Sequence, residues 1–85
     1  MSDSALIAEL AEIVRQVAMT PPEVAITAET RLAEDLGVDS FDMVGIVFSI
    51  QDRYGLKVRE EDMPALATIA ALASYIARRG KSEAA

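Results

Sequence analysis

The sequence contains neither histidine nor cysteine, and only 5% of its residues are aromatic. Without an imidazole or a thiol, the chain cannot form a Ser-His-Asp triad, a cysteine nucleophile, a disulfide or an iron–sulfur cluster. It also lacks the usual zinc ligands, and no Asp-rich loop has the spacing of an EF-hand. The composition leaves a site of carboxylates alone for Mg²⁺ or Ca²⁺ open. We nevertheless expect no metal site, and no covalent catalysis by this chain alone.

Positive charge is also scarce, with 8 basic residues against 14 acidic ones and a net charge of −6. Nucleic acid is a poor partner for such a chain because phosphate binding needs clustered Lys and Arg, whereas basic protein surfaces are suitable partners. No apolar run approaches the ~20 residues of a membrane span, and the first residues carry acids where a signal peptide needs bases. These features predict a cytoplasmic monomer that binds other proteins.

The apolar residues, 52% of the chain, are mostly Ala, Leu, Ile and Val, a composition that favours helices over a sheet. Helical spacing is found over 5–18 and 40–54, and a third long helix begins after the cap Thr68 and is expected to end at Gly80. A brief helix is expected over 60–66. We predict an all-α bundle of three or four helices, with one domain over 1–80 and a frayed tail over 81–85.

The first two long helices are joined by a long connection, residues 20–38. Ile26, Leu32 and Leu36 are expected to hold this connection against the core, and Asp35-Leu36-Gly37 reads as a short turn of helix. A connection of this length lets the two helices run parallel or antiparallel, so the topology stays open at this point.

The helix expected over 40–54, with Asp39 as its N-cap, has two apolar faces. At 100° per residue, one face lies within about 60° of Met43; it consists of Met43, Ile46, Val47, Ile50 and Tyr54. The other face, which we call the aromatic face, consists of Phe41, Val44 and Phe48. A bundle this small cannot easily bury both faces. The aromatic face either covers loop residues such as Leu32 or Val38, or is partly exposed and docks partner proteins.

Acidic residues gather around the same helix. Between residues 32 and 52 there is no Lys or Arg, and there are five acids: Glu34, Asp35, Asp39, Asp42 and Asp52. Such a stretch is either an ordinary solvated surface or a region that attracts basic partners.

The most informative segment is Asp35-Leu36-Gly37-Val38-Asp39-Ser40, which opens the helix over 40–54. It resembles the D-L-G-x-D-S signature of the acyl carrier protein family. The resemblance covers most of the chain, because the loop segment 26–32 and the downstream segments Tyr54-Gly55-Leu56-Lys57-Val58 and Thr68-Ile69 also look like the family. It implies a carrier-type helical bundle.

The resemblance implies that Ser40 is esterified with 4′-phosphopantetheine from coenzyme A. The first turn of a helix suits this role, because the helix N-terminus favours a phosphate. No His is present and no Lys is near to activate Ser40, so a phosphopantetheinyl transferase must supply the base and the metal. The resemblance also assigns Asp39 to the transferase's Mg²⁺ site. The residues expected to contact partners are Asp35, Phe41, Asp42, Val44, Phe48 and Asp52.

Four residues depart from the family pattern. Phe41 replaces the usual Leu, and Gly45, Gln51 and Arg53 stand where general fatty-acid carriers tend to have Glu. The helix is therefore less acidic and more apolar than usual in the family. This indicates a dedicated carrier in a specialised lipid, polyketide or related pathway.

The function expected from the resemblance is to hold an acyl or aminoacyl group as a thioester and to present it to acyl-loading and acyl-processing enzymes with basic surfaces. Two alternatives remain open. One is an aminoacyl or peptidyl carrier that an adenylating ligase loads. The other is a helical interaction module that keeps the fold and is never modified.

Overall fold

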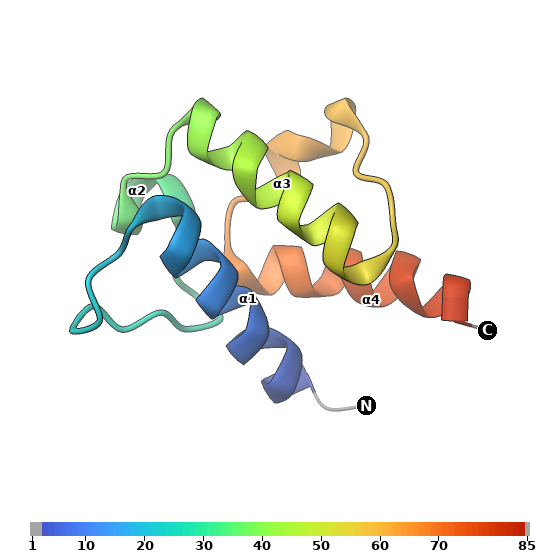
Figure 1. Cartoon of the computed structure of the whole chain (residues 1–85), viewed down its shortest axis with the longest axis horizontal. Helices are drawn as coiled ribbons and strands as arrows, with labels where there is room; N and C mark the ends of the chain where they lie inside the picture. The colour runs from blue at the N-terminus through green and yellow to red at the C-terminus, as the bar shows by residue number, and fades with distance from the viewer. Residues whose placement is uncertain (1–2, 85) are drawn as a thin grey trace.

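The computed structural model describes the backbone of residues 3–84 and the side chains of residues 4–79. Its elements in chain order are α1 (Asp3–Ala18), α2 (Leu32–Leu36), α3 (Ser40–Tyr54), the 3₁₀-helix η1 (Glu60–Ala65) and α4 (Ile69–Ala84) (Figure 1). Within 3–84 there is no β-strand, so the predicted all-α bundle is confirmed. None of the helices in this range is long and apolar enough to cross a membrane.

The topology left open by the sequence is antiparallel for α1 and α3. Near one end of the pair, the Tyr54 hydroxyl donates a 2.7 Å hydrogen bond to Oε1 of Glu9. Near the other end, Gly45 faces Val17 so closely that a Cβ atom at Gly45 would lie 3.1 Å from Cγ1 of Val17. Because an early residue of α1 meets a late residue of α3, and the reverse, the two helices run in opposite directions (Figure 1).

The core lies where the three long helices meet. The largest fully buried side chains are Leu10 and Val14 of α1, Ile46 and Ile50 of α3, and Ile69 and Leu72 of α4. Burying a side chain of this size stabilises the fold by about 1.5–3 kcal/mol relative to leaving it exposed. These positions match the helical spacing of the sequence, which therefore predicted the inner faces of all three helices.

The long connection after α1 is attached to the start of α4 rather than left free. The N–H of Leu32 donates to the carbonyl of Ala67 at 2.9 Å, and the N–H of Ile69 donates to the carbonyl of Thr30 at 3.3 Å. Leu32 is buried, whereas Ile26 and Leu36 are partly buried against the core, as expected. The connection therefore holds α2 beside the N-terminus of α4.

The end of α1 shows a feature that the sequence did not predict. Met19 has a φ of 55°, in the left-handed region that glycine normally occupies, and the N–H of Thr20 donates to the carbonyl of Arg15 at 2.9 Å. This bond is typical of a Schellman helix end. Pro21 follows and cannot continue a helix, so the chain turns away from α1 at Met19, whose backbone adopts the left-handed conformation.

The expectation that Gly80 ends the last helix is wrong, because α4 continues to Ala84. A glycine lowers helix propensity by about 1 kcal/mol, which weakens a helix without forcing it to stop. Residues 81–84 are described only as backbone within α4, and Ala85 lies outside the described residues. The frayed tail and the domain boundary at residue 80 therefore remain predictions.

Candidate functional site

Ser40 is the first residue of α3, and its side chain is exposed. Asp39 precedes it in an extended conformation, and its Oδ1 accepts a 2.8 Å hydrogen bond from the N–H of Asp42. The carbonyl of Asp39 accepts the first helical bond, from the N–H of Met43 at 2.9 Å. Asp39 is thus the N-cap that the sequence predicted, and it presents the Ser40 hydroxyl to solvent at a helix N-terminus.

The loop before Ser40 is fixed by its backbone and by one buried side chain. Gly37 has a φ of 70° and donates its N–H to the carbonyl of Ala33 at 3.1 Å. Val38 is buried and donates its N–H to the carbonyl of Leu32 at 2.9 Å. A residue with a Cβ atom would be strained at position 37. Glycine, buried valine and capping aspartate therefore position Ser40 in succession.

Asp35 is held by Arg31, which lies one residue before the acidic stretch. Its Oδ2 accepts the backbone N–H of Arg31 at 2.8 Å, and its Oδ1 lies 3.1 Å from Nη2 of the same residue. The backbone hydrogen bond, followed by the guanidinium bond, holds the pKa of Asp35 below its usual range. Nη1 of Arg31 also lies 3.1 Å from Oε1 of Glu34. Arg31 therefore offsets part of the charge that the sequence assigned to this region.

The acids near α3 itself are in a different situation. Among the described side chains, Asp39, Asp42 and Asp52 make no ion pair with Lys or Arg. Asp39 caps the helix and Asp42 lies in its first turn, so this end of α3 carries negative charge, whereas Asp52 in the last turn is followed by Arg53. Of the three acids predicted to contact partners, Asp42 and Asp52 lie on α3, which carries the aromatic face, whereas Asp35 lies on α2 beside Arg31.

The aromatic face of α3 is exposed, with 85% of Phe41, 44% of Val44 and 64% of Phe48 open to solvent. On the opposite face, Ile46 and Ile50 are buried. The expectation that one apolar face is partly exposed is therefore confirmed. The alternative in which the two phenylalanines cover loop residues is wrong, because Leu32 and Val38 are buried without them and both rings remain largely in solvent.

A mostly apolar pocket of about 460 Å³ lies beside Ser40. Ser40 and Met43 of α3 line it together with Met63 and Pro64 of η1 and with Leu66. The chain segments before and after α3 thus meet at Ser40. Sequence reasoning missed this pocket, because residues some 23 positions apart come together only through packing. The brief helix expected over 60–66 was the only feature of the sequence that could have indicated a wall of this pocket.

Arg31 also lines this pocket, although no Lys or Arg occurs between residues 32 and 52. Sequence reasoning missed it because Arg31 lies just outside the acidic stretch. Its guanidinium is already engaged by Glu34 and Asp35, so it is a paired cation beside the site rather than a free one.

Three departures from the family pattern have contacts within the chain. Gly45 allows the close approach of Val17, and the Oε1 of Gln51 accepts the N–H of Val58 at 2.9 Å. Nε of Arg53 lies 3.7 Å from Oε1 of Glu9. Each of these residues contacts a neighbouring element, whereas Phe41, the fourth departure, is 85% exposed on the aromatic face.

Comparison with known proteins agrees with this geometry. A family model described as "Phosphopantetheine attachment site" matches residues 8–76. The meromycolate extension acyl carrier protein of Mycolicibacterium aurum is 37% identical over 75 residues, which are 88% of this chain and 76% of that protein. The chain belongs to the acyl carrier protein family.

Two further relatives support this assignment. An acyl carrier protein of Rhodococcus erythropolis is 38% identical over 71 residues, covering 84% of this chain and 77% of that protein. An acyl carrier protein of Bdellovibrio bacteriovorus is 36% identical over 70 residues, covering 82% of this chain and 87% of that protein.

As a member of this family, the chain is a non-catalytic carrier with covalently attached 4′-phosphopantetheine. Its partners include a phosphopantetheinyl transferase and acyl-processing enzymes.

The residues around Ser40 fit this prosthetic group. Attachment needs an accessible hydroxyl, which Ser40 supplies, and the phosphate is favoured by the N-terminus of the 15-residue helix α3. The apolar pocket beside Ser40 offers a surface for an apolar group carried close to the attachment point. The carrier family and the local geometry therefore agree.

Proposed function

We propose that this acyl carrier protein bears its pantetheine arm on Ser40 and uses the aromatic face of α3 to dock the enzymes that load and process the cargo. The observation that carries the proposal is the position of Ser40, exposed at the start of α3, between the apolar pocket and the aromatic face. The thiol at the end of the arm supplies the thioester linkage on which an acyl group is carried.

The chain's own residues position Ser40 but do not activate it. The carboxylate of Asp39 is occupied by the N–H of Asp42, which keeps the first turn of α3 ordered around the hydroxyl. The guanidinium of Arg31, which lines the same pocket, is paired with two acids. The transferase therefore has to provide the base that takes the Ser40 proton, and the other carboxylate oxygen of Asp39 is available to its Mg²⁺.

The pocket beside Ser40 is the proposed resting place for the acyl chain near the thioester. Its volume of about 460 Å³ lies within the range of small-ligand pockets, about 300–1,000 Å³. Two of its lining residues, Met43 and Met63, have flexible thioether side chains that adapt to ligands of different shape. Such a pocket suits a flexible alkyl chain better than a charged aminoacyl group, which favours an acyl cargo over the aminoacyl alternative.

The docking surface combines apolar contact with negative charge. Phe41, Val44 and Phe48 are exposed along one side of α3, while Asp42 and Asp52 lie near its ends. A matching partner has an apolar pocket for the rings and a basic rim for the acids. The rings supply binding energy, and the acids act mainly on the association rate.

A specialised pathway is the proposed setting. Relatives named for meromycolate extension and relatives named only as acyl carrier proteins match with similar identity. Phe41, which exposes 85% of its surface, is therefore the better support for a dedicated set of partners. Lipid synthesis is favoured by the relatives' names, with a polyketide or related pathway as the alternative. We retain the expectation of a cytoplasmic monomer.

The attachment site is tested by intact mass after incubation with a phosphopantetheinyl transferase and coenzyme A. We expect the wild type to gain one phosphopantetheinyl group and Ser40→Ala to gain none while keeping its helical circular dichroism. Ser49→Ala, on the same helix, is the matched control and should be modified at the wild-type rate. A mass gain in Ser40→Ala would refute the assignment, and an unmodified wild type would support the interaction-module alternative.

The acidic contribution is tested by the salt dependence of binding to the transferase. Exposed charges are screened over a Debye length of about 8 Å at physiological ionic strength. Salt should therefore slow association more than it speeds dissociation. Asp42→Asn and Asp52→Asn should reduce this salt dependence, whereas Asp35→Asn should reduce it less because Arg31 already pairs with Asp35. An association rate that is independent of salt would contradict the proposal.

A further inference from the structure

The 3₁₀-helix η1 forms one wall of the pocket beside Ser40, yet it has little internal support. It is six residues long, contains Pro64 and has no fully buried residue. A 3₁₀-helix has poorer hydrogen-bond geometry than an α-helix and is seldom longer than three or four residues. Its position must therefore depend on contacts with other elements.

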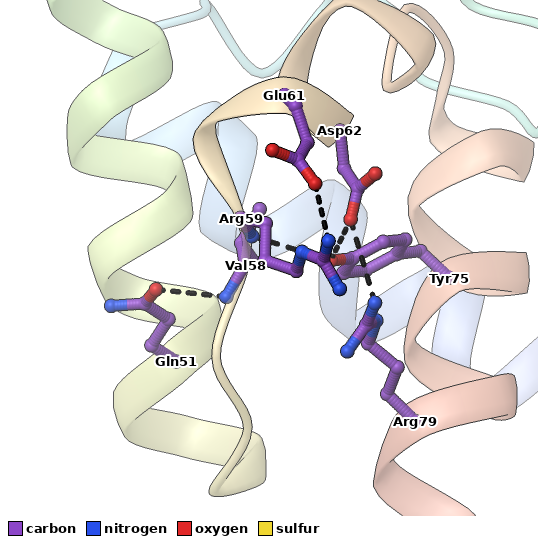
Figure 2. A network of polar contacts seen from close by, with 7 residues as sticks. All are labelled: Gln51, Val58, Arg59, Glu61, Asp62, Tyr75 and Arg79. Atoms are coloured by element: carbon purple, nitrogen blue, oxygen red, sulfur yellow. Dashed lines mark hydrogen bonds and ion pairs between the residues drawn. The ribbon is translucent and has the colours of Figure 1, made fainter.

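A group of three side chains, which we call the Tyr75 cluster, connects η1 to α4. The cluster consists of Asp62, Tyr75 and Arg79 (Figure 2). The Tyr75 hydroxyl donates a 2.7 Å hydrogen bond to Oδ2 of Asp62 and accepts the N–H of Arg59 at 3.4 Å. Nη2 of Arg79 lies 3.5 Å from the same carboxylate oxygen, and its guanidinium carbon lies 4.8 Å from the centre of the Tyr75 ring.

The contacts of the Tyr75 cluster differ from those of an ordinary surface ion pair. Tyr75 is buried, and the side chains of Asp62 and Arg79 are 31% and 39% exposed. The hydroxyl thus joins two points of the η1 segment, the backbone of Arg59 and the carboxylate of Asp62. Just before η1, Gln51 of α3 accepts the N–H of Val58, which fixes the approach to η1 on the other side (Figure 2).

The pocket side of η1 begins at the residue after Asp62. Met63 and Pro64 line the pocket, as does Leu66, and Ser40 and Met43 lie among the residues that complete it. Asp62 and Met63 are adjacent in one turn of helix, so a movement of the Asp62 backbone moves the Met63 side chain. The Tyr75 cluster is thereby coupled to the width of the pocket, although none of Tyr75, Arg79 or Gln51 lines it.

We propose that Asp62, Tyr75 and Arg79 are positioning residues that hold η1 against α4 and so keep this wall of the pocket beside Ser40 close to its contents. The part of this inference that concerns cargo rests on the proposed function, whereas the part that concerns η1 does not. Loss of the Tyr75 hydroxyl releases two contacts of the η1 segment at once. The wall then samples open positions, and water reaches the atoms that the pocket shields.

The first test observes the pocket wall directly in the unmodified protein. The chain has four methionines. Met43 and Met63 line the pocket, Met19 directly follows α1 and is 84% exposed, and Met1 lies outside the described residues. With ¹³C-methyl methionine labelling, each gives one NMR signal. In Tyr75→Phe we expect the Met63 methyl signal to shift or broaden, that of Met43 to change less, and that of Met19 to stay in place.

Tyr54→Phe is the matched control, because it removes the other tyrosine hydroxyl of the chain, which also donates a 2.7 Å hydrogen bond to a carboxylate, that of Glu9. Tyr54 lies at the end of α3 and does not line the pocket. The Met63 signal should be unchanged in this variant. An unchanged Met63 signal in Tyr75→Phe, or an equal change in Tyr54→Phe, would overturn the proposal.

A second variant separates the hydrogen bond from the charge. Asp62→Asn keeps an oxygen that can accept the Tyr75 hydroxyl but loses the pairing with Arg79, so its Met63 signal should move only part of the way. Asp62→Ala loses both contacts and should match or exceed Tyr75→Phe. If Asp62→Asn and Asp62→Ala have the same effect as each other, the hydroxyl contact does not position η1 and the proposal fails.

The cargo part is tested by loading the chain with an octanoyl-pantetheinyl group from octanoyl-coenzyme A and following thioester hydrolysis at constant pH. We expect the hydrolysis rate to rise about two- to tenfold in Tyr75→Phe, the factor that corresponds to loss of the shorter of its two hydrogen bonds, the one to Asp62, and to be unchanged in Tyr54→Phe. Equal rates in wild type and Tyr75→Phe would overturn the shielding role. If the wild-type thioester hydrolyses as fast as free octanoyl-pantetheine, the proposed cargo pocket is wrong, while the methionine signals still decide the role of the cluster.

Discussion

The two apolar faces of α3 are both hydrophobic but lie in opposite surroundings. Ile46 and Ile50 are almost completely buried against α1 and α4, whereas Phe41 and Phe48, the only phenylalanines of the chain, are mostly in solvent. A mostly exposed phenylalanine gains only a small part of the burial energy that a core position offers. The aromatic face is therefore better explained by the contacts it makes with partners than by the stability of the free protein.

This difference shows that a pattern of apolar residues identifies the hydrophobic faces of a helix but does not show which of them is buried. Judged by hydrophobicity alone, the ring-bearing face was as good a candidate for the core as the aliphatic one. The neighbours decide between them. Gly45 allows α1 to pack closely on one flank of α3, and the other long helices cover the aliphatic face. No described element of the chain is left to cover the aromatic face.

The largest expected effect concerns the buried face. Ile46→Ala should lower the free energy of unfolding by about 2–5 kcal/mol, because it removes a fully buried side chain and leaves a cavity. Val44→Ala, on the exposed side of the same helix, is the control and should change it by less than about 0.5 kcal/mol. Urea unfolding followed by circular dichroism measures both. Similar values for the two variants would abolish the distinction between the faces.

A smaller effect is expected at the boundary between the faces. Gly45→Leu should destabilise the protein by about 1–3 kcal/mol, because the added atoms collide with Val17 where a Cβ atom alone would lie 3.1 Å from its Cγ1. In Gly45→Ala the gain in helix propensity, about 1 kcal/mol, opposes the cost of moving Val17, so the net change should be near zero. Thermal melts of the two variants test this, and a stabilising leucine would show that α1 and α3 are not closely packed here.

Substitutions in the aromatic face should weaken partner binding but have little effect on the stability of the fold. Phe48→Ala should cost well under the 3–5 kcal/mol typical of a buried phenylalanine, because 64% of its surface is exposed. The same change should weaken partner binding or loading by about 1 kcal/mol or more, as for an interface anchor. Thermal melts of this variant measure the effect on stability, and loading kinetics measure the effect on partner binding. Severe unfolding would mean that the ring belongs to the core.

The smallest effect is a dependence on alkaline pH at the end of the buried face. Burial, and then the hydrogen bond to Glu9, raises the pKa of Tyr54 to about 12. The unfolded value is about 10, so the folded state keeps this proton to higher pH. The contribution of Tyr54 to stability is therefore complete below pH of about 10 and is lost as the pH rises towards 12.

Tyr54→Phe provides the measurement for this prediction. Urea unfolding of wild type and variant should show a stability difference that narrows between pH of about 10 and about 12, since only the wild type has this proton to lose. A difference that stays constant over this range would show that the hydroxyl of Tyr54 is not held by Glu9. Below pH of about 9 the difference should not depend on pH, which is the internal control.

Much of the site was predictable because its determinants are local. Asp39 caps α3 through the N–H of Asp42, three residues away, and the bounds of α3 agree with the predicted helix over 40–54. The presence of two apolar faces on α3 also followed from helical spacing. Gly80 shows the limit of such local signals, because a glycine is compatible with a helix end and with a weaker helix, and here the backbone of α4 continues through it.

The rest was not predictable because it depends on residues far apart in the chain. The hydrogen bond between Tyr75 and Asp62 spans 13 positions, and the one between Tyr54 and Glu9 spans 45. Gln51, which looked like a lost acid, proved to hold the backbone of Val58. Each of these roles needs the partner's position as well as its identity, and spacing along one helix contains no such information.

The sequence by itself determined the helices, the turn that presents Ser40 and the two apolar faces of α3, because caps, left-handed glycine and helical periodicity act within a few residues. Only the tertiary structure decided that α1 runs antiparallel to α3, that Arg31 offsets Asp35 and Glu34, and that η1 completes the pocket beside Ser40. The physical reason is that packing and charge pairing depend on distance in space, and several arrangements of the same helices satisfy the same local rules.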